Sequence, residues 1–281
     1  MGRIQRTIEL AKASWAVLRE HRGLAVLPVL SFVANLVVLA GFLGLILLVG
    51  VDGGTGGGAD GFDASPFVYV LGVFGYLAAT IVTVFFQTAL VSGADEALSG
   101  GEPSVGSSLH AATSRLDRIL PWALLTGTVG LILQAVEERA GFVGQIVANL
   151  VGAAWRIVTF LVVPVLVVED LGPIAATKRS AQLFRSTWGE NLAAQMGFGL
   201  LGFLAALPAL LVGGVAVASG NLGVAVVGVA VAVAWLAVVM TVVAALSGIF
   251  QMALYRYATS GDVPGGFPSE AVRAAFGPRR R

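Results

Sequence analysis

Six long stretches of the chain are apolar and almost free of charge, and no other feature restricts the fold as much. They run over 24–50, 66–92, 119–136, 143–168, 192–218 and 222–254. A helix needs roughly 20 apolar residues to cross the ~30 Å hydrocarbon core of a bilayer, because its backbone polar groups must be satisfied within the segment. The composition agrees, since 57% of the residues are hydrophobic and only 12% are charged. We therefore expect an all-α integral membrane bundle of six transmembrane helices, forming one domain over 1–281.

The distribution of Lys and Arg predicts the orientation of these spans. With the N-terminus in the cytoplasm, fifteen basic residues fall on the cytoplasmic side and only Arg139 falls on the other, while Arg156 lies within a span. Loops on the cytoplasmic side of membrane proteins carry such an excess of basic residues. The pattern predicts a multi-pass protein of the cell membrane with both termini cytoplasmic. Residues 255–281 would form a cytoplasmic tail, and the Gly-rich segment 51–65 a flexible external loop.

Amphipathic segments precede every second span. Apolar residues recur at helical spacing in 1–23, in 103–118 and, more weakly, in 171–190. This pattern is typical of helices that lie flat in the membrane interface. The chain is therefore expected to consist of three helical hairpins, each preceded by an amphipathic interfacial helix, with the lipid bilayer as its main partner.

Two short segments in different spans resemble each other. The second span contains FQTAL at 86–90, and the sixth contains FQMAL at 250–254. The likeness is suggestive of repetition, although apolar spans draw on few residue types. Gln87 and Gln251 are each single amides near a cytoplasmic end, and such amides are expected to bond across helices.

A polar stripe on the fourth expected span gives the candidate binding residues. At 100° per residue, Glu138, Gln145, Asn149 and Arg156 fall on one side of a helix. A charge at the middle of a span costs at least ~2.5–3.5 kcal/mol, so Arg156 should be paired, face a cavity or reach the surface. Two interpretations stay open: an outward-facing polar cavity in which Arg156 holds an anionic group, or an internal pairing, with Gln134 or Glu138 as partner, that joins helices.

Several function classes lack the residues that they need. The chain has no cysteine, and His21 and His110 are isolated, so no metal site is expected. The string GFGLLG at 197–202 matches a dinucleotide fingerprint but lies inside an apolar span with no preceding strand. A net charge of +1 gives no general attraction to nucleic acid. We expect no enzyme activity, cofactor, nucleotide or nucleic acid. The acidic pair Glu169–Asp170 is interpreted as a cation site or, more commonly, as the cap of the following helix.

A motif near the end of the fourth span resembles a known group of proteins. It comprises Trp155, Thr159-Phe160, Pro164-Val165-Leu166, Glu169, Gly172-Pro173, Ala176, Arg179-Ser180, Leu183 and Trp188-Gly189-Glu190, together with Ser14-Trp15, Leu27-Pro28 and Glu138-Arg139 elsewhere. Over most of its length the chain resembles an uncharacterised family of prokaryotic polytopic membrane proteins, a domain of unknown function. More loosely, it is similar to the membrane segments attached to some glycerophosphodiester phosphodiesterases, whose catalytic domain is absent from this sequence. The resemblance implies a membrane protein and no particular activity.

Two functions fit these patterns. The first is a non-enzymatic scaffold or accessory protein that binds a protein partner at a cytoplasmic surface built from 103–118 and 171–190. It depends on the interfacial segments and on the lack of a catalytic set. The alternative is a transporter or lipid-handling protein with an outward-facing polar cavity around Arg156, which depends on the polar stripe.

Overall fold

Every secondary-structure element in the described part of the chain is a helix. The computed structural model describes residues 3–52, 66–139, 141–187, 198–261 and 267. Its helices are α1 (Arg3–Glu20), α2 (Gly23–Asp52), α3 (Pro66–Leu98), α4 (Val105–Thr113), α5 (Leu116–Arg139), α6 (Gly141–Thr159), α7 (Val162–Val168), α8 (Pro173–Thr187), α9 (Phe198–Ala218) and α10 (Leu222–Ser260). The all-helical prediction is therefore confirmed for this part of the chain. The expected external loop was 51–65, but residues 51–52 belong to α2; the rest of that loop and most of the expected tail lie outside the described residues.

Among the described residues, five helical stretches are long and apolar enough to cross a membrane. They are Gly23–Leu48, Pro66–Leu98, Leu116–Arg139, Gly144–Val168 and Leu222–Ser260. The remaining expected span, 192–218, falls on α9, whose described apolar stretch Gly202–Ala218 is shorter. Residues 192–197 of that expected span lie outside the described residues. The number and length of these apolar helices are compatible with a multi-pass membrane protein.

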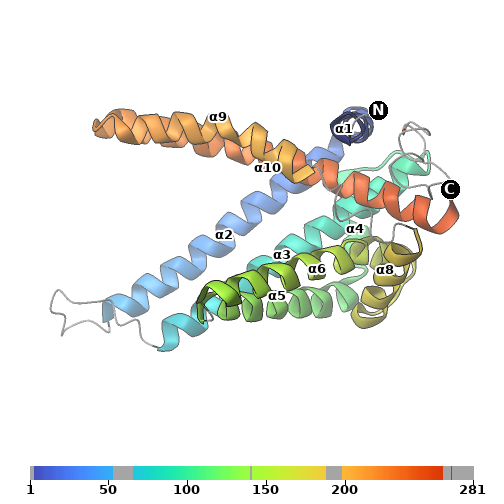
Figure 1. Ribbon diagram of the computed structural model, residues 1–281, viewed down its shortest axis with the longest axis horizontal. Coiled ribbons are helices and arrows are strands. Elements are labelled where there is room, and N and C mark those ends of the chain that lie inside the picture. Colours follow the sequence, from blue (N-terminus) through green and yellow to red (C-terminus); the bar gives the residue numbers. More distant parts are fainter. Residues whose placement is uncertain (1–2, 53–65, 140, 188–197, 262–266, 268–281) are drawn as a thin grey trace.

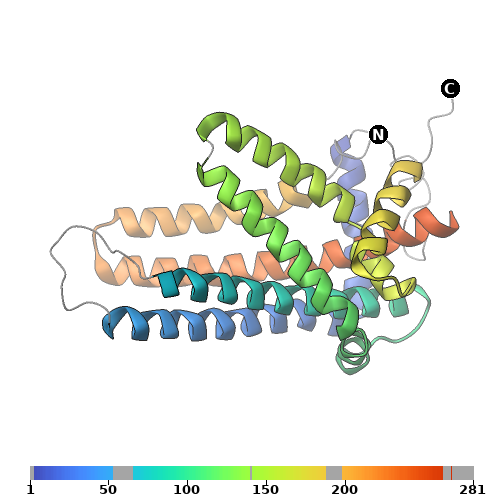
Figure 2. The ribbon, with the colours of Figure 1, turned by 90° about the horizontal axis from the view of Figure 1, so that it is seen from below.

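The long helices diverge from one common end of the molecule, which we call the base. Three consecutive pairs, α2–α3, α5–α6 and α9–α10, pack side by side and point away from it (Figure 1, Figure 2). The base contains α1, α4, α7 and α8 together with the adjoining ends of α3 and α10 (Figure 1). We call each of these helix pairs an arm. α10 joins its own arm to the α2–α3 arm and to the base, because it contacts α2 and α3 as well as α1, α7 and α8.

Burial separates the base from the arms. The largest fully buried apolar side chains, which include Leu24, Leu27, Val91, Ile119, Leu161, Leu166, Ile249 and Met252, belong to helices that meet at the base. Six of the seven residues of α7 are buried. On the arms, in contrast, side chains such as Val37 and Val215 are 68% and 71% exposed. Apolar surface of this kind is stable when lipid tails, which are as apolar as the side chains, surround it.

The amphipathic N-terminal helix packs one of its sides on the protein. Leu10, Ala13, Val17 and Leu18 are buried against the protein, whereas Trp15 is 45% exposed. α1 contacts α10 through this buried side. α1 therefore packs one apolar side against the base, and Trp15 lies on the side of α1 that faces away from the base.

The fourth expected span is broken near its end. α6 ends at Thr159 and α7 begins at Val162. The backbone N–H of Leu161 donates to Ser180 Oγ at 3.1 Å, and Ser180 Oγ donates to the carbonyl oxygen of Val158 at 2.6 Å. A side chain from α8 thus satisfies backbone groups that the break leaves without helical partners.

Candidate functional site

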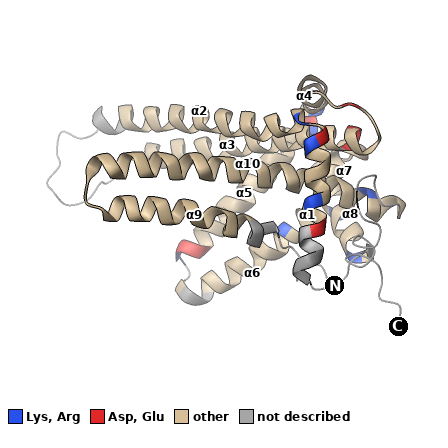
Figure 3. Cartoon of the chain, turned by 90° about the horizontal axis from the view of Figure 1, so that it is seen from above, with Lys and Arg blue, Asp and Glu red and all other residues tan. Residues whose placement is uncertain are grey.

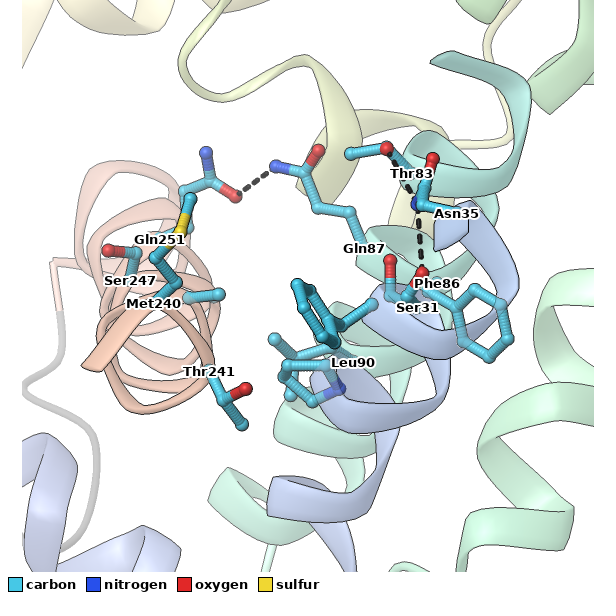
Figure 4. A pocket seen from close by; sticks show the side chains of 14 residues that line it. Ser31, Asn35, Thr83, Phe86, Gln87, Leu90, Met240, Thr241, Ser247 and Gln251 are labelled. Atoms are coloured by element: carbon cyan, nitrogen blue, oxygen red, sulfur yellow. Dashed lines mark hydrogen bonds between the residues drawn. The ribbon is translucent and has the colours of Figure 1, made fainter. Parts of the chain in front are cut away.

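A cavity of about 410 Å³ lies among α2, α3 and α10, near the base. Its polar lining consists of Ser31, Asn35, Thr83, Gln87, Thr241, Ser247 and Gln251, and none of the described residues that line it is charged. The rest of the lining is apolar and includes Phe32, Phe86, Leu90 and Met240 (Figure 4). Apolar walls with a few convergent polar groups are typical of small-molecule sites, and the volume lies in their usual range of ~300–1,000 Å³.

The two amides predicted to bond across helices meet at this cavity. Gln87 Nε2 donates to Gln251 Oε1 at 3.3 Å, which confirms that prediction (Figure 4). The two FQxAL segments therefore lie against each other, one on α3 and one on α10. Their close approach needs Gly248, because a Cβ at that position would lie 2.5 Å from Leu90 Cδ2.

On the opposite wall of the cavity, the side chains of Asn35 and Thr83 already donate hydrogen bonds within the protein. Asn35 Nδ2 donates to the carbonyl oxygen of Ser31 at 2.9 Å and to Thr83 Oγ1 at 3.2 Å. Thr83 Oγ1 donates to the carbonyl oxygen of Ala79 at 2.8 Å. By contrast, Gln87 Oε1 and Gln251 Nε2 have no hydrogen-bond partner within the described ranges. The amide pair thus keeps one acceptor and one NH₂ donor for a ligand.

Sequence reasoning missed this cavity, although a spacing signal was present. In each of the three helices a hydroxyl residue stands four positions before an amide residue: Ser31 and Asn35, Thr83 and Gln87, Ser247 and Gln251. Residues four apart share one side of a helix. Each helix therefore carries a short polar face, but only the packing of the three helices places these faces around one space.

Charged side chains gather at the base, with a further group at the far end of α5 (Figure 3). Arg179 Nε donates to both carboxylate oxygens of Glu169 at 2.9 Å, and Tyr255 Oη donates to Glu169 Oε1 at 3.0 Å. Arg256 Nε donates to Asp95 Oδ1 at 2.9 Å, which joins α10 to α3. These ion pairs connect segments that are distant in the sequence.

The acidic pair Glu169–Asp170 is held by arginines. Glu169 pairs with Arg179, and Asp170 pairs with Arg118 and lies 4.0 Å from Arg115 Nε. Asp170 also has a φ of 54°, a conformation that Asp tolerates better than most residues. Through these described contacts, the acidic pair links α5, α8 and α10.

The predicted polar stripe is divided between two helices: Glu138 belongs to α5, and the other three residues belong to α6, so the expectation that all four share one helix is wrong. Gln134 Nε2 donates to Glu138 Oε1 at 3.0 Å, within α5. Gln145, Asn149 and Arg156 are exposed on α6, and Arg156 makes no ion pair within the described part of the chain. None of these five residues lines the cavity among α2, α3 and α10. Their role in ligand binding stays a prediction.

Arg156 lies closer to the base than a continuous span would place it. The neighbouring Trp155 stacks on Trp122, with ring centroids 6.3 Å apart, and Trp122 is near the start of α5. The break at Phe160–Leu161 explains the difference, because the last part of the apolar stretch 143–168 forms α7 and is buried in the base. Arg156 is near the middle of the apolar stretch 143–168, but it is near the end of α6 and therefore not in the middle of the α5–α6 arm.

Comparison with known proteins identifies a family. Residues 66–266, which include all of the cavity lining from α3 and α10 but not that from α2, match the model of the family of unknown function DUF6159. No curated protein matches the chain, and no solved structure matches it. The match covers well over half of the sequence, so the chain belongs to DUF6159, an uncharacterised family.

Proposed function

We propose that this protein is a six-span integral membrane protein that binds a lipid-like molecule in the cavity among α2, α3 and α10. One observation carries this proposal: an uncharged cavity of about 410 Å³, with mostly apolar walls and a few polar groups, lies between helices whose outer surfaces are apolar. The role is binding rather than catalysis, since the sequence contains no recognised nucleophile–base pair or metal-ligand set.

The position of the cavity suggests how a ligand enters. The α9–α10 arm and the α2–α3 arm diverge from the base (Figure 1), and the cavity is lined by both arms close to the point where they part. Within a bilayer, lipid tails would fill the space between the arms. A lipid therefore reaches the cavity sideways from the membrane, without passing through water.

The proposed orientation places the base in the cytoplasm. Ion pairs and other charges gather at that end (Figure 3), and most basic residues of the sequence belong to segments at or beside it. α1, α4 and α8 then lie at the cytoplasmic interface, with the exposed Trp15 at the depth of the headgroups. α9 supplies the fifth of the six spans, and each of the three hairpins follows an interfacial helix.

Blocking the cavity tests the proposal. Ala244→Phe places a large side chain in the lining, whereas Val238→Phe adds the same ring on the same helix at a residue that is 60% exposed and does not line the cavity. We expect the lipid retained per chain after extensive detergent washing, measured by mass spectrometry, to fall severalfold in Ala244→Phe only. Equal retention in both variants and the wild type would rule out binding in this cavity.

The base supports a second candidate function, a scaffold that docks a protein partner. α8 exposes the apolar Ile174, which is 66% exposed, together with the basic Lys178 and Arg185. A mixed apolar and cationic surface of this kind suits an acidic partner segment. Cross-linking in mild detergent should then recover a stoichiometric partner from wild-type cells but not from an Ile174→Asp strain; bare protein in both would count against this role.

A further inference from the structure

We propose that Gln87 and Gln251 bind the hydroxyl group of an uncharged lipid alcohol, a step that rests on the proposed lipid binding in this cavity. The amides belong to two different arms, and their side chains point toward each other across one end of the cavity (Figure 4). A ligand group that bonds both would lie between α3 and α10, where the arms part.

The lining excludes a charged headgroup. None of the lining residues in the described part of the chain is ionisable. The cation nearest in sequence on α10, Arg256, lies five residues beyond Gln251, about 8 Å along the helix axis, and it is paired with Asp95. A phosphate in the cavity would therefore lose its hydration without gaining a counter-charge, which is strongly unfavourable. An uncharged head avoids this cost.

The amide atoms of Gln87 and Gln251 that are not used in their mutual hydrogen bond favour an alcohol over other uncharged lipid headgroups. Gln251 Nε2 can donate and Gln87 Oε1 can accept, since the bond between the amides uses only the other two atoms. Rotating both amides by 180° reverses the bond but still leaves one donor and one acceptor. A hydroxyl group both donates and accepts, so it can bond both free atoms at once. An ester oxygen only accepts, and it would leave the free carbonyl of the pair without a partner.

The rest of the cavity fits the adjoining tail. Phe32, Phe86, Leu90 and Met240 supply apolar walls beside the amides. The volume of about 410 Å³ is enough for a head and the first part of a chain, but not for a whole membrane lipid. The remaining tail would lie between the diverging arms, in contact with bilayer lipid. Both a diacylglycerol and a polyprenol present this chemistry.

A matched lipid series tests the inference. The full chain, purified in detergent, is titrated with 1,2-dioleoylglycerol, its 3-acetyl ester, dioleoyl phosphatidic acid, a polyprenol and the corresponding polyprenyl phosphate, and binding is measured by native mass spectrometry. We expect at least one free alcohol to bind about tenfold or more tightly than its acetylated or phosphorylated counterpart. Whether dioleoylglycerol or the polyprenol binds identifies the source of the hydroxyl.

Variants then locate the preference. Gln87→Met with Gln251→Met keeps the side-chain length and removes the hydrogen bonds, so it should reduce the preference for the alcohol to within about twofold. Gln182→Met, at an exposed residue of α8 that does not line the cavity, should leave the preference unchanged. The preference for an alcohol is measured with the wild-type chain alone. Poor folding of the double variant would therefore leave that measurement intact.

The outcomes separate the two proposals. If alcohol, ester and phosphate bind equally, and Ala244→Phe removes all of them, the cavity binds lipid but the choice of an alcohol is wrong. If none of the lipids binds the wild-type chain, or Ala244→Phe changes nothing, lipid binding in this cavity is wrong as well. A preference for the alcohol that survives in the double Gln variant would overturn the roles of Gln87 and Gln251.

Discussion

Single polar side chains decide how the segments of the base are joined. Glu169 accepts hydrogen bonds from Arg179 on α8 and from Tyr255 on α10, so one carboxylate connects three parts of the chain. Tyr255 is only 3% exposed, and its hydroxyl bonds a charged group, a kind of hydrogen bond that is stronger than a neutral one. Because such contacts link distant residues, they contribute to the position of α10 and not only to local structure.

Removing the Tyr255 hydroxyl should destabilise the fold measurably. We expect Tyr255→Phe to lower the free energy of unfolding by about 1.5 kcal/mol, since a hydrogen bond to a charged group is lost while Glu169 keeps Arg179. Unfolding by SDS titration measures the change. Tyr69→Phe is the matched control, because Tyr69 is 67% exposed near the start of α3. Superimposable curves for Tyr255→Phe and the wild type would show that this bond contributes nothing.

At the scale of elements, the break between α6 and α7 depends on a neighbouring helix. Residues 143–168 are mostly apolar and carry a single charge, Arg156, and the sequence alone predicted one helix there. The break is stabilised by Ser180, which accepts from the N–H of Leu161 and donates to the carbonyl of Val158. Both bonds reach across from α8, about twenty residues later in the chain. This separation is the reason that local sequence patterns did not reveal the break.

Ser180→Ala should therefore destabilise the base. The substitution leaves the buried N–H of Leu161 without its acceptor, and an unsatisfied buried donor costs about 1–3 kcal/mol. The expected result is a lower unfolding midpoint in SDS and faster amide hydrogen exchange at Leu161. Ser186→Ala, on the same helix, removes only a bond to the carbonyl of Leu183 and should change neither. Unchanged exchange at Leu161 in Ser180→Ala would contradict the role given to the side chain.

At the scale of the whole molecule, the charges at the base and the bare apolar arms define two environments. The base has a packed interior and ion pairs, whereas the arms expose large apolar side chains along their length. A bilayer can cover the arms, and the charged base suits the interface. The proposed orientation then follows from the excess of Lys and Arg on the side of the base.

Single-cysteine labelling tests this orientation cleanly, because the chain has no cysteine of its own. Ser219 lies at the turn between α9 and α10, and Glu102 lies between α3 and α4 at the base; both are exposed. In intact cells, a membrane-impermeant maleimide should label Ser219→Cys, and it should label Glu102→Cys only after the membrane is permeabilised. The reverse pattern would invert the proposed topology, and labelling of both in intact cells would place both ends outside.

The sequence by itself determined the features that depend on local composition and spacing. Uninterrupted apolar stretches predicted the helices, because only a helix satisfies the backbone within such a segment. The isolation of Gln87 and Gln251 among apolar residues predicted that they bond across helices, because a lone amide in that setting needs a partner. The helical spacing of Gln145, Asn149 and Arg156 predicted that they share one helix, as they do on α6, whereas the fourth member of the predicted stripe lies on α5.

Tertiary structure decided which of these faces meet. The cavity needs three helices from opposite ends of the sequence, and each contributes a polar face too short to stand out on its own. Arg156 lies closer to the base than predicted because Ser180 stabilises a break in the helix. The Glu169–Asp170 pair forms ion pairs with arginines on α8 and α5. Side-chain contacts between segments far apart in the chain fix these features, and no local pattern encodes such contacts.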